Sequence, residues 1–423
     1  MPNSDLALPT VPGAAPHPHF FRQLRLFLEE ICSEICRFRH VEHDGVPPDA
    51  VQVSREVDLG IPGAFADIVV EPTGLGPYFV EVKYSYATDR MVQHLVRKYG
   101  TQAPSLPGAN KLVLVVDAAS RTDWPEQEAR LRRGLRPDLA LEVWDESRLC
   151  SLIHECFKID LKAITIDSLR DVRGAIDDAK WAYAFGDKWT GSSYQSPLLW
   201  HFGFWRLRQL HQKYGLTPEQ ILPPGRYRGV VILLADLSSF SSFVRDTRDD
   251  EVVRSALTTY YSNARYAVMN AGGMMCQFVG DEVVALFGVP LSDEGYASRA
   301  LDCARALVQI GSSVSNKWQR EIDRVQASGG VHIGMAMGDV EVVPLRPFCR
   351  THMGVIGDAI NMAARLMSCA GSSQVVASNT YFQMLPEAER SRFEETEPVE
   401  GKNVGLIKSW RLTLPSSFSP TGA

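Results

Sequence analysis

The stretch that decides the fold of the C-terminal half is VVILLADLSSFSSF, residues 230–243. Its six leading apolar residues predict a buried strand, and Asp236 follows them directly. A second stretch, QFVGDEVVALFG (277–288), has two apolar runs divided by Gly280 and Asp281, which predicts a two-residue hairpin. Taken singly, each aspartate is a typical turn or capping residue. If the strands are neighbours, however, the two carboxylates meet at one edge of a sheet, as a pair of Mg²⁺ or Mn²⁺ ions requires.

A third segment, VIGDAINMAARL (355–366), predicts a helix that begins after Gly357. Asn361 and Arg365 are four residues apart, so they lie on one face of that helix. A neutral hydrogen-bonding group beside a fixed cation is suited to positioning a ribose and stabilising phosphoryl charge. A solvent-exposed helix face would tolerate both residues equally well.

In this order and at this separation, the three segments resemble the catalytic domain of class III nucleotidyl cyclases over residues 227–412. The resemblance implies a ferredoxin-like α+β domain that binds two divalent metal ions, Mn²⁺ or Mg²⁺, through two aspartates and a backbone carbonyl group. It also implies an asparagine that orients the ribose, an arginine that stabilises the reacting phosphorus, and a lysine, in VEGK, that contacts the terminal phosphates. The matching residues here are Asp236, Asp281, Leu237 (by its carbonyl group), Asn361, Arg365 and Lys402.

The family builds its active sites between two catalytic domains placed head to tail, and the residues here match one such domain. The resemblance therefore implies a homodimer with two shared active sites. In each site, the two aspartates of one subunit face the asparagine, arginine and lysine of the other. The implied substrate is a nucleoside triphosphate, whose 3′-oxygen attacks the α-phosphorus while pyrophosphate leaves.

The positions that read the base depart from the family's pattern. Where adenylate cyclases carry Lys and guanylate cyclases carry Glu, this chain has Gln277, and the second purine-reading position is Gly354. A glutamine amide both donates and accepts hydrogen bonds, which suits the amide-like edge of uracil, although it can also bind adenine. Phe240 is expected to contact the substrate, and His332 stands where the family often has Arg or Lys against the triphosphate.

The catalytic positions match the family, whereas the positions that read a purine base do not. In this combination the sequence resembles the pyrimidine cyclases of bacterial anti-phage (Pycsar) systems. That resemblance implies conversion of UTP to cyclic UMP, which would activate a separate effector protein. One alternative is an adenylate cyclase of ordinary signalling. Another is a nuclease-like protein whose cyclase-like domain only binds a nucleotide.

Residues 19–165 predict an α/β domain with an acidic motif of its own. Asp67 lies inside the apolar run FADIVVE, and Glu81 and Lys83 lie on one face of the next run, YFVEVKY. These residues resemble the motif with which the PD-(D/E)xK restriction-endonuclease-like superfamily binds Mg²⁺ and activates water. Residues 1–165, however, hold 18 basic and 23 acidic residues, a net charge of −5, whereas a DNA-cleaving domain normally has a basic face. We therefore expect a sensor or scaffold rather than an active nuclease, and nucleic-acid binding stays open.

The composition of the 423 residues is typical of a soluble globular protein with two or three domains. No apolar run reaches the length of a membrane span and the first residues lack the features of a secretory signal, so a cytoplasmic protein without a membrane contact is expected. The expected organisation is a disordered start (1–18), the endonuclease-like domain (19–165), a linker or transducer (166–226), the cyclase domain (227–412) and a flexible tail (413–423).

Overall fold

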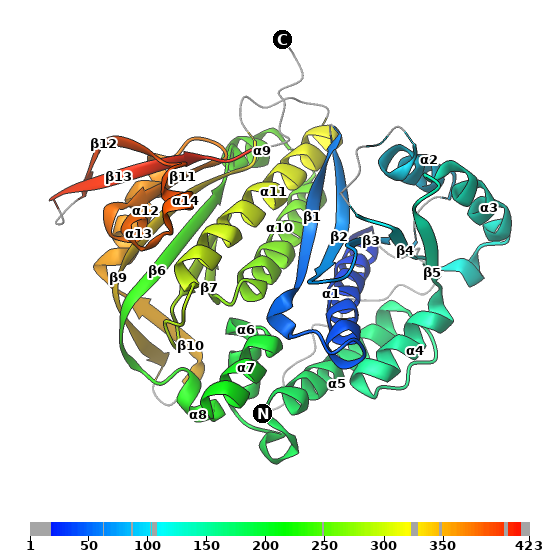
Figure 1. The fold of residues 1–423 in the computed structure, drawn as a ribbon, viewed down its shortest axis with the longest axis horizontal. Helices are drawn as coiled ribbons and strands as arrows, with labels where there is room; N and C mark the ends of the chain where they lie inside the picture. Colours follow the sequence, from blue (N-terminus) through cyan, green and yellow to red (C-terminus); the bar gives the residue numbers. More distant parts are fainter. Residues whose placement is uncertain are drawn as a thin grey trace, which may run out of the picture.

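The computed structural model describes residues 18–61, 63–85, 88–101, 103, 108–247, 249–322, 329–346, 349–401 and 405–415. Within these ranges the chain forms a five-stranded sheet in its N-terminal part and an eight-stranded sheet in its C-terminal half (Figure 1). None of the helices in the described ranges is long and apolar enough to cross a lipid bilayer.

The elements of the N-terminal part are α1 (Pro18–Glu42), β1 (Val51–Ile61), β2 (Ala64–Pro72), β3 (Tyr78–Val82), α2 (Thr88–Tyr99), β4 (Lys111–Val115), α3 (Trp124–Gly134), β5 (Ala140–Trp144) and α4 (Glu146–Phe157). Their sheet has the order β1-β2-β3-β4-β5, antiparallel from β1 to β3 and parallel from β3 to β5. Helices α1 and α4 cover one face, and α2 and α3 cover the other. The two apolar runs that carry the acidic motif are β2 and β3, as expected, whereas the sequence analysis did not anticipate β1.

Four helices follow, α5 (Ile166–Phe185), α6 (Gln195–His201), α7 (Phe204–Tyr214) and α8 (Pro218–Ile221). Their apolar side chains are not a separate unit, because Trp181 and Phe202 are buried in one cluster with Ile232 of the large sheet. The segment expected to connect the two domains therefore also covers one face of the large sheet.

The C-terminal elements are β6 (Gly225–Leu237), α9 (Phe240–Asp246), α10 (Asp250–Asn270), β7 (Met274–Val279), β8 (Glu282–Phe287), α11 (Tyr296–Ile322), β9 (Val331–Arg346), β10 (Cys349–Ile356), α12 (Asp358–Ser368), β11 (Gln374–Ser378), α13 (Asn379–Met384), α14 (Glu387–Arg390), β12 (Glu394–Gly401) and β13 (Gly405–Thr413). The sheet order is β12-β13-β11-β9-β6-β8-β7, and β10 pairs with β9. The chain order β6-α10-β7-β8-α11-β9 with the strand order β9-β6-β8-β7 is the ferredoxin-like arrangement expected from the sequence. Helices α10 and α11 cover one face of the sheet, and α12 packs on the other together with α5 to α7.

The two sheets are joined through β1, the edge strand of the N-terminal sheet, which lies against α10 and α11 (Figure 1). The amide of Asn270, on α10, donates a 2.7 Å hydrogen bond to the carbonyl group of Val53. Tyr266, also on α10, is buried in the core of the N-terminal sheet. An exposed edge strand would leave its polar groups open to other chains, so this packing also protects the edge.

Candidate active site

Two aspartates converge at one edge of the large sheet. Strand β6 carries Asp236 next to its end, and β8 pairs antiparallel with β6 so that Ala235 lies opposite Val283. The hairpin from β7 to β8 turns at Gly280 and Asp281, and Gly280 has a φ of 62°, which residues with a side chain rarely adopt. This topology brings the carboxyl groups of Asp281 and Asp236 into hydrogen-bonding contact. The two acids that the sequence placed at a common edge therefore do meet.

The electrostatic environment of this aspartate pair favours a cation. Burial, followed by the hydrogen bond and the charge of Asp236, raises the pKa of Asp281 to about 7, and His332 opposes this only in part. Nε2 of His332 lies 3.1 Å from Oδ2 of Asp236, and neither aspartate forms an ion pair with a described Lys or Arg. Two crowded carboxylates whose ion-pair partner among the described residues is a histidine, and not a Lys or Arg, fit a divalent metal ion, because such an ion would remove their repulsion.

Further ligands of a metal ion would have to come from groups other than the side chains of Asp236 and Asp281. In the described part of the chain, no group of three or more His, Cys, Asp or Glu side chains is arranged to hold a metal ion. Leu237, whose carbonyl group was expected to be a ligand, pairs with Val331 of β9 and is 2% exposed. Backbone oxygens and substrate phosphates are therefore the groups that could complete the coordination.

Helix α10 supports the hairpin that carries Asp281. The ring of Tyr261 stacks on Phe278 with a centroid distance of 4.2 Å, and its hydroxyl donates a hydrogen bond to the carbonyl group of Gly280. Tyr260 is completely buried beside it, and burial together with the charges of the two aspartates raises its pKa well above the usual range. The position of Asp281 is thus coupled to α10.

Helix α12 presents Asn361 and Arg365 together. It packs so closely on β9 that a Cβ atom at Gly334 would lie 2.1 Å from the carbonyl oxygen of Ala363. Its apolar side faces the sheet, while Asn361 and Arg365 are exposed and form no hydrogen bond or ion pair through their side chains with another described residue. Within one chain, the two residues therefore have no contact with the aspartate pair.

The positions expected to read the base lie on two different strands. Gln277 is exposed on β7, directly after an irregularity where Met275 faces Ala285 and Gln277 faces Val284. Gly354 is on β10, opposite Val343 of β9.

Two further expected substrate contacts have different outcomes. Phe240 is 9% exposed and packs on Trp318 with ring centroids 5.9 Å apart, so its observed contacts are those of a core residue. Lys402 lies outside the described residues.

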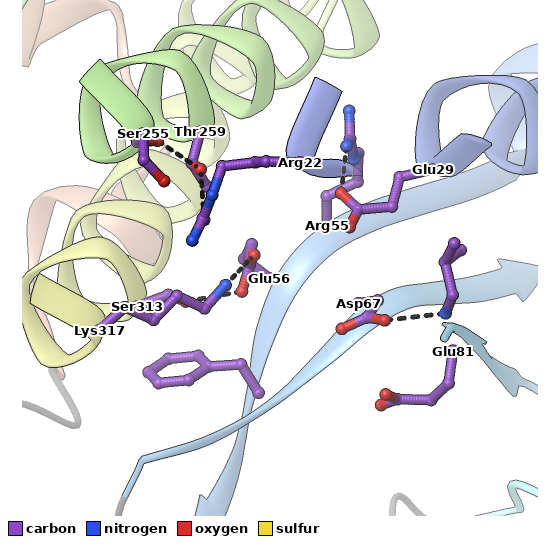
Figure 2. Close-up of polar contacts among 12 residues, drawn as sticks. Arg22, Glu29, Arg55, Glu56, Asp67, Glu81, Ser255, Thr259, Ser313 and Lys317 are labelled. Atoms are coloured by element: carbon purple, nitrogen blue, oxygen red, sulfur yellow. Dashed lines mark hydrogen bonds and ion pairs between the residues drawn. The ribbon is translucent and has the colours of Figure 1, made fainter. Parts of the chain in front are cut away.

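The acidic motif of the N-terminal sheet is also assembled (Figure 2). Nζ of Lys83 lies 2.5 Å from Oδ2 of Asp67 and 2.6 Å from Oε2 of Glu81. Lys98, on α2, forms an ion pair with Glu81 at 2.9 Å, and the hydroxyl of Tyr99 donates to the same carboxylate at 2.5 Å. Burial opposes ionisation of Asp67, but Lys83 and Lys98 hold its pKa far below the usual range. Two lysines therefore neutralise this acidic cluster.

This cluster borders a cavity of about 300 Å³ that is also lined by residues of α1, α10 and α11. Glu56, on β1, accepts a 2.6 Å hydrogen bond from Ser313 and pairs with Lys317 at 2.6 Å, both on α11 (Figure 2). Its φ of 53° is rare for a residue with a side chain and persists where surrounding contacts hold it. Neither Glu56 nor Lys98 was predicted from the sequence, because only packing brings their partners to them.

Comparison with known proteins places the C-terminal half in a family. Residues 222–413 match the model of the adenylate and guanylate cyclase catalytic domain. The chain is 26% identical over 182 residues to adenylate cyclase 1 of Rhizobium meliloti (strain 1021), a match that covers 42% of this chain and 26% of that protein. It is 28% identical over 145 residues to an adenylate cyclase of Anabaena cylindrica, covering 33% of this chain and 27% of that protein. The matches thus span only about a quarter of these relatives' length.

Two solved structures are similar over the same share of the chain. The guanylyl cyclase Cya2 is 25% identical with a TM-score of 0.40, covering 46% of this chain and 95% of that one. The adenylyl cyclase CyaB of P. aeruginosa is 18% identical with a TM-score of 0.37, covering 48% of this chain and all of that one. From the family match, the C-terminal half of this mixed α/β protein contains a class III cyclase catalytic domain.

Proposed function

We propose that this chain is a nucleotide cyclase that converts a nucleoside triphosphate, with UTP preferred, into the 3′,5′-cyclic monophosphate and pyrophosphate. The observation that carries the proposal is the contact of Asp236 and Asp281 within the residues that match the cyclase domain. Two Mg²⁺ or Mn²⁺ ions held by these carboxylates and the carbonyl group of Leu237 would supply Lewis-acid activation of the 3′-hydroxyl and neutralise the triphosphate.

The chain's own residues position the substrate and stabilise charge. The 3′-oxygen forms a bond to the α-phosphorus, the bond from that phosphorus to the pyrophosphate oxygen breaks, and the hydroxyl proton passes to solvent. Asn361 hydrogen-bonds the ribose and so fixes the direction of attack. Arg365 places a positive charge where negative charge accumulates on the phosphorus oxygens, and Lys402 binds the terminal phosphates.

The proposed active unit is a homodimer with two shared sites. Its support is that the side chains of Asn361 and Arg365 are exposed without partners among the described residues, so one chain leaves each site incomplete. The apolar side chains Val279 and Ile356 are 53% and 59% exposed near the two halves of the site, where a second subunit could cover them.

Mixing two inactive variants tests this arrangement. Asp281→Ala and Arg365→Ala proteins, mixed in equal amounts, should recover about a quarter of wild-type turnover, because half of the dimers are mixed and each has one intact site. Each variant alone serves as the control. No recovery after subunit exchange, shown by sedimentation of differently tagged subunits, would contradict shared sites.

UTP is the proposed substrate because Gln277 and Gly354 bring no fixed charge that would select a purine base. The test is incubation with Mn²⁺ and an equimolar mixture of ATP, GTP, CTP and UTP, followed by mass spectrometry. Cyclic UMP is the expected main product. An adenylate cyclase is the second candidate, because the relatives from Rhizobium and Anabaena are adenylate cyclases, and cyclic AMP as main product would establish it.

The N-terminal domain is proposed to be an endonuclease-like sensor that does not cut nucleic acid. The support is that Glu81 is completely buried and already engaged by Lys83, Lys98 and Tyr99, which leaves it a poor metal ligand. The test is incubation with single- and double-stranded DNA and RNA in Mg²⁺ or Mn²⁺. Cleavage that disappears in Asp67→Ala would overturn the proposal and favour the nuclease alternative.

The proposed role of the product is that of a second messenger in anti-phage defence. It would act on a separate effector that binds the cyclic nucleotide. Phage infection of cells that carry the wild-type or the Asp281→Ala protein, with cyclic nucleotides measured in extracts, tests this role. A rise in cyclic UMP on infection with the wild-type protein only is the expected result.

A further inference from the structure

A second cavity, separate from the aspartate pair, lies between the N-terminal sheet and the helices of the C-terminal half. Its volume is about 470 Å³, and its walls come from β1, α7, α10 and α11. This volume is within the usual range of small-molecule sites. We propose that this interdomain cavity binds a phosphorylated small molecule of nucleotide size.

The first argument is that buried polar groups in the cavity wall lack partners. Nε and Nη1 of Arg55, both amide atoms of Asn263 and Nε of Arg206 have no hydrogen-bond partner among the residues that the structure describes. Arg55, Asn263 and Arg206 are 4%, 0% and 7% exposed. Buried donors and acceptors are nearly always paired, so three such residues along one cavity indicate a ligand that pairs with them.

The second argument is the charge of the wall, which favours an anion. Asp293 pairs at 2.9 Å with Arg206 and at 2.5 Å with Arg299, and Arg55 pairs at 2.6 Å with Glu29, so acids neutralise part of the basic charge of the wall but not all of it. Guanidinium groups with free N–H donors bind phosphate oxygens in a matching planar geometry. The cavity is lined by six basic residues, Arg37, Arg55, Arg206, Arg208, Lys213 and Arg299, and by three acidic residues, Asp49, Asp293 and Asp302.

The third argument is that the site is built for more than a phosphate group. The free amide of Asn263 offers one donor and one acceptor atom, as the hydrogen-bonding edge of a base or a ribose requires. Trp205 and Tyr266 are also among the lining residues, and aromatic residues are common surfaces for bases. A bare phosphate ion would use only the basic part of this lining.

Helix α10 connects this cavity to the aspartate pair. It carries Asn263 in the cavity wall and, two residues earlier, Tyr261, which holds the hairpin of Asp281. A ligand in the cavity would therefore contact the helix that positions a metal-binding residue. The binding site stands independently of the proposed cyclase activity, whereas this coupling rests on it.

Binding is tested on the full-length Asp281→Ala protein in EDTA, so that the triphosphate site does not contribute. The probes for isothermal titration are AMP, GMP, CMP, UMP and inorganic phosphate. We expect at least one nucleotide to bind with a Kd below 1 mM and at least tenfold more tightly than phosphate. Asn263→Leu in this background should weaken that binding at least tenfold.

A surface pair keeps the test valid if Asn263→Leu fails to fold. Lys213→Glu changes an exposed lysine of the cavity rim, and Lys188→Glu is its matched control, an exposed lysine outside the lining. Both lysines lie over an aromatic ring, Tyr214 at 5.2 Å and Trp189 at 5.4 Å. If nucleotide binding weakens by about threefold or more in Lys213→Glu but not in Lys188→Glu, the result supports the site. Binding of no probe with a Kd below 1 mM, or equal binding by both variants, would overturn the site. Phosphate binding less than tenfold more weakly than the tightest nucleotide would overturn the nucleotide assignment.

Coupling is measured separately, as turnover of the otherwise wild-type protein with and without the nucleotide found to bind. We expect a change of at least twofold that Lys188→Glu retains and Lys213→Glu loses. Confirmed binding without a change in turnover would overturn the coupling but not the site. Absence of any cyclase product under all conditions would instead overturn the proposed function.

Discussion

The two acidic clusters of this molecule each contain a pair of carboxylates but have opposite electrostatics. In the C-terminal sheet, Asp236 and Asp281 meet without a Lys or Arg partner among the described residues, and the pKa of Asp281 rises to about 7. In the N-terminal sheet, Lys83 and Lys98 surround Asp67 and Glu81, and the pKa of Asp67 is held far below its usual range. Among the described residues, the first cluster has only His332 as a basic partner, whereas the second already contains two lysines.

This difference teaches that a carboxylate motif does not by itself identify a metal site. Whether a pair of carboxylates can hold a metal ion depends on the charge that the surrounding elements bring to it. On β6 and the β7–β8 hairpin no described lysine reaches the acids, so a metal ion has a place there. Beside β2 and β3, Lys83 and Lys98 of α2 already supply the positive charge that a metal ion would bring, which favours a structural or sensing role.

The largest expected effect is on the cluster of Asp236 and Asp281. Asp281→Ala should lower the rate of cyclic nucleotide formation at least about 1000-fold, because it removes a proposed metal ligand. Its thermal unfolding temperature should stay the same or rise, because a repulsion between buried acids is also removed. The matched control is Asp339→Asn, a partly exposed acid on β9 paired with Arg226, which should keep turnover within twofold. Near-normal turnover of the Asp281 variant would contradict the metal assignment.

The next effect is on the stability of the neutralised cluster. Lys98→Met should lower the free energy of unfolding by about 3 kcal/mol, because it removes a cation from the completely buried Glu81. Lys111→Met, which breaks a 3.6 Å pair with half-exposed Glu142, is the control and should cost less than about 1 kcal/mol. Urea denaturation followed by circular dichroism measures both. Equal costs would show that Glu81 does not depend on its lysines.

A third effect is that the N-terminal acids should make the protein sensitive to low pH. Although burial opposes it, Lys180 lowers the pKa of Glu30 to about 2, at an ion-pair distance of 3.2 Å. This stabilisation is complete above the unfolded pKa of about 4.5 and is lost as the pH falls towards 2. Glu30→Gln should therefore unfold at a temperature roughly 3 °C lower than wild type at pH 7, and the difference should shrink at pH 3.5. A difference that grows on acidification would contradict the assignment.

The smallest effect is expected where the two regions touch. Lys317, on α11, is 43% exposed, so Lys317→Met should cost at most about 1 kcal/mol although it breaks a 2.6 Å pair with Glu56. Ser313 still donates to the Glu56 carboxylate in that variant. Urea denaturation is again the measurement. A cost above about 2 kcal/mol would show that the contact between the two sheets depends on this single ion pair.

Much of the cyclase half could be predicted because its motifs are local. A strand that ends near Asp236, a two-residue turn at Asp281 and a helix that begins after Gly357 each follow from neighbouring residues, and all three are confirmed. Phe240 is the contrast: that it contacts the substrate stays a prediction from its place in a short motif, whereas the packing of its ring on Trp318 of α11 is seen only in the structure. That packing depends on a helix some 80 residues further along the chain, which no local pattern reveals.

By itself, the sequence determined which side chains stand at strand ends, at a hairpin tip and on one face of a helix, because backbone periodicity and turn chemistry act over a few residues. Only the tertiary structure decided which of these groups have charged partners. Glu56 meets Ser313 and Lys317 across more than 250 residues of chain, and Arg55 and Asn263 come to one cavity from β1 and α10. The physical reason is that ion pairs and cavities depend on distance in space, which burial of the two sheets against α10 and α11 sets.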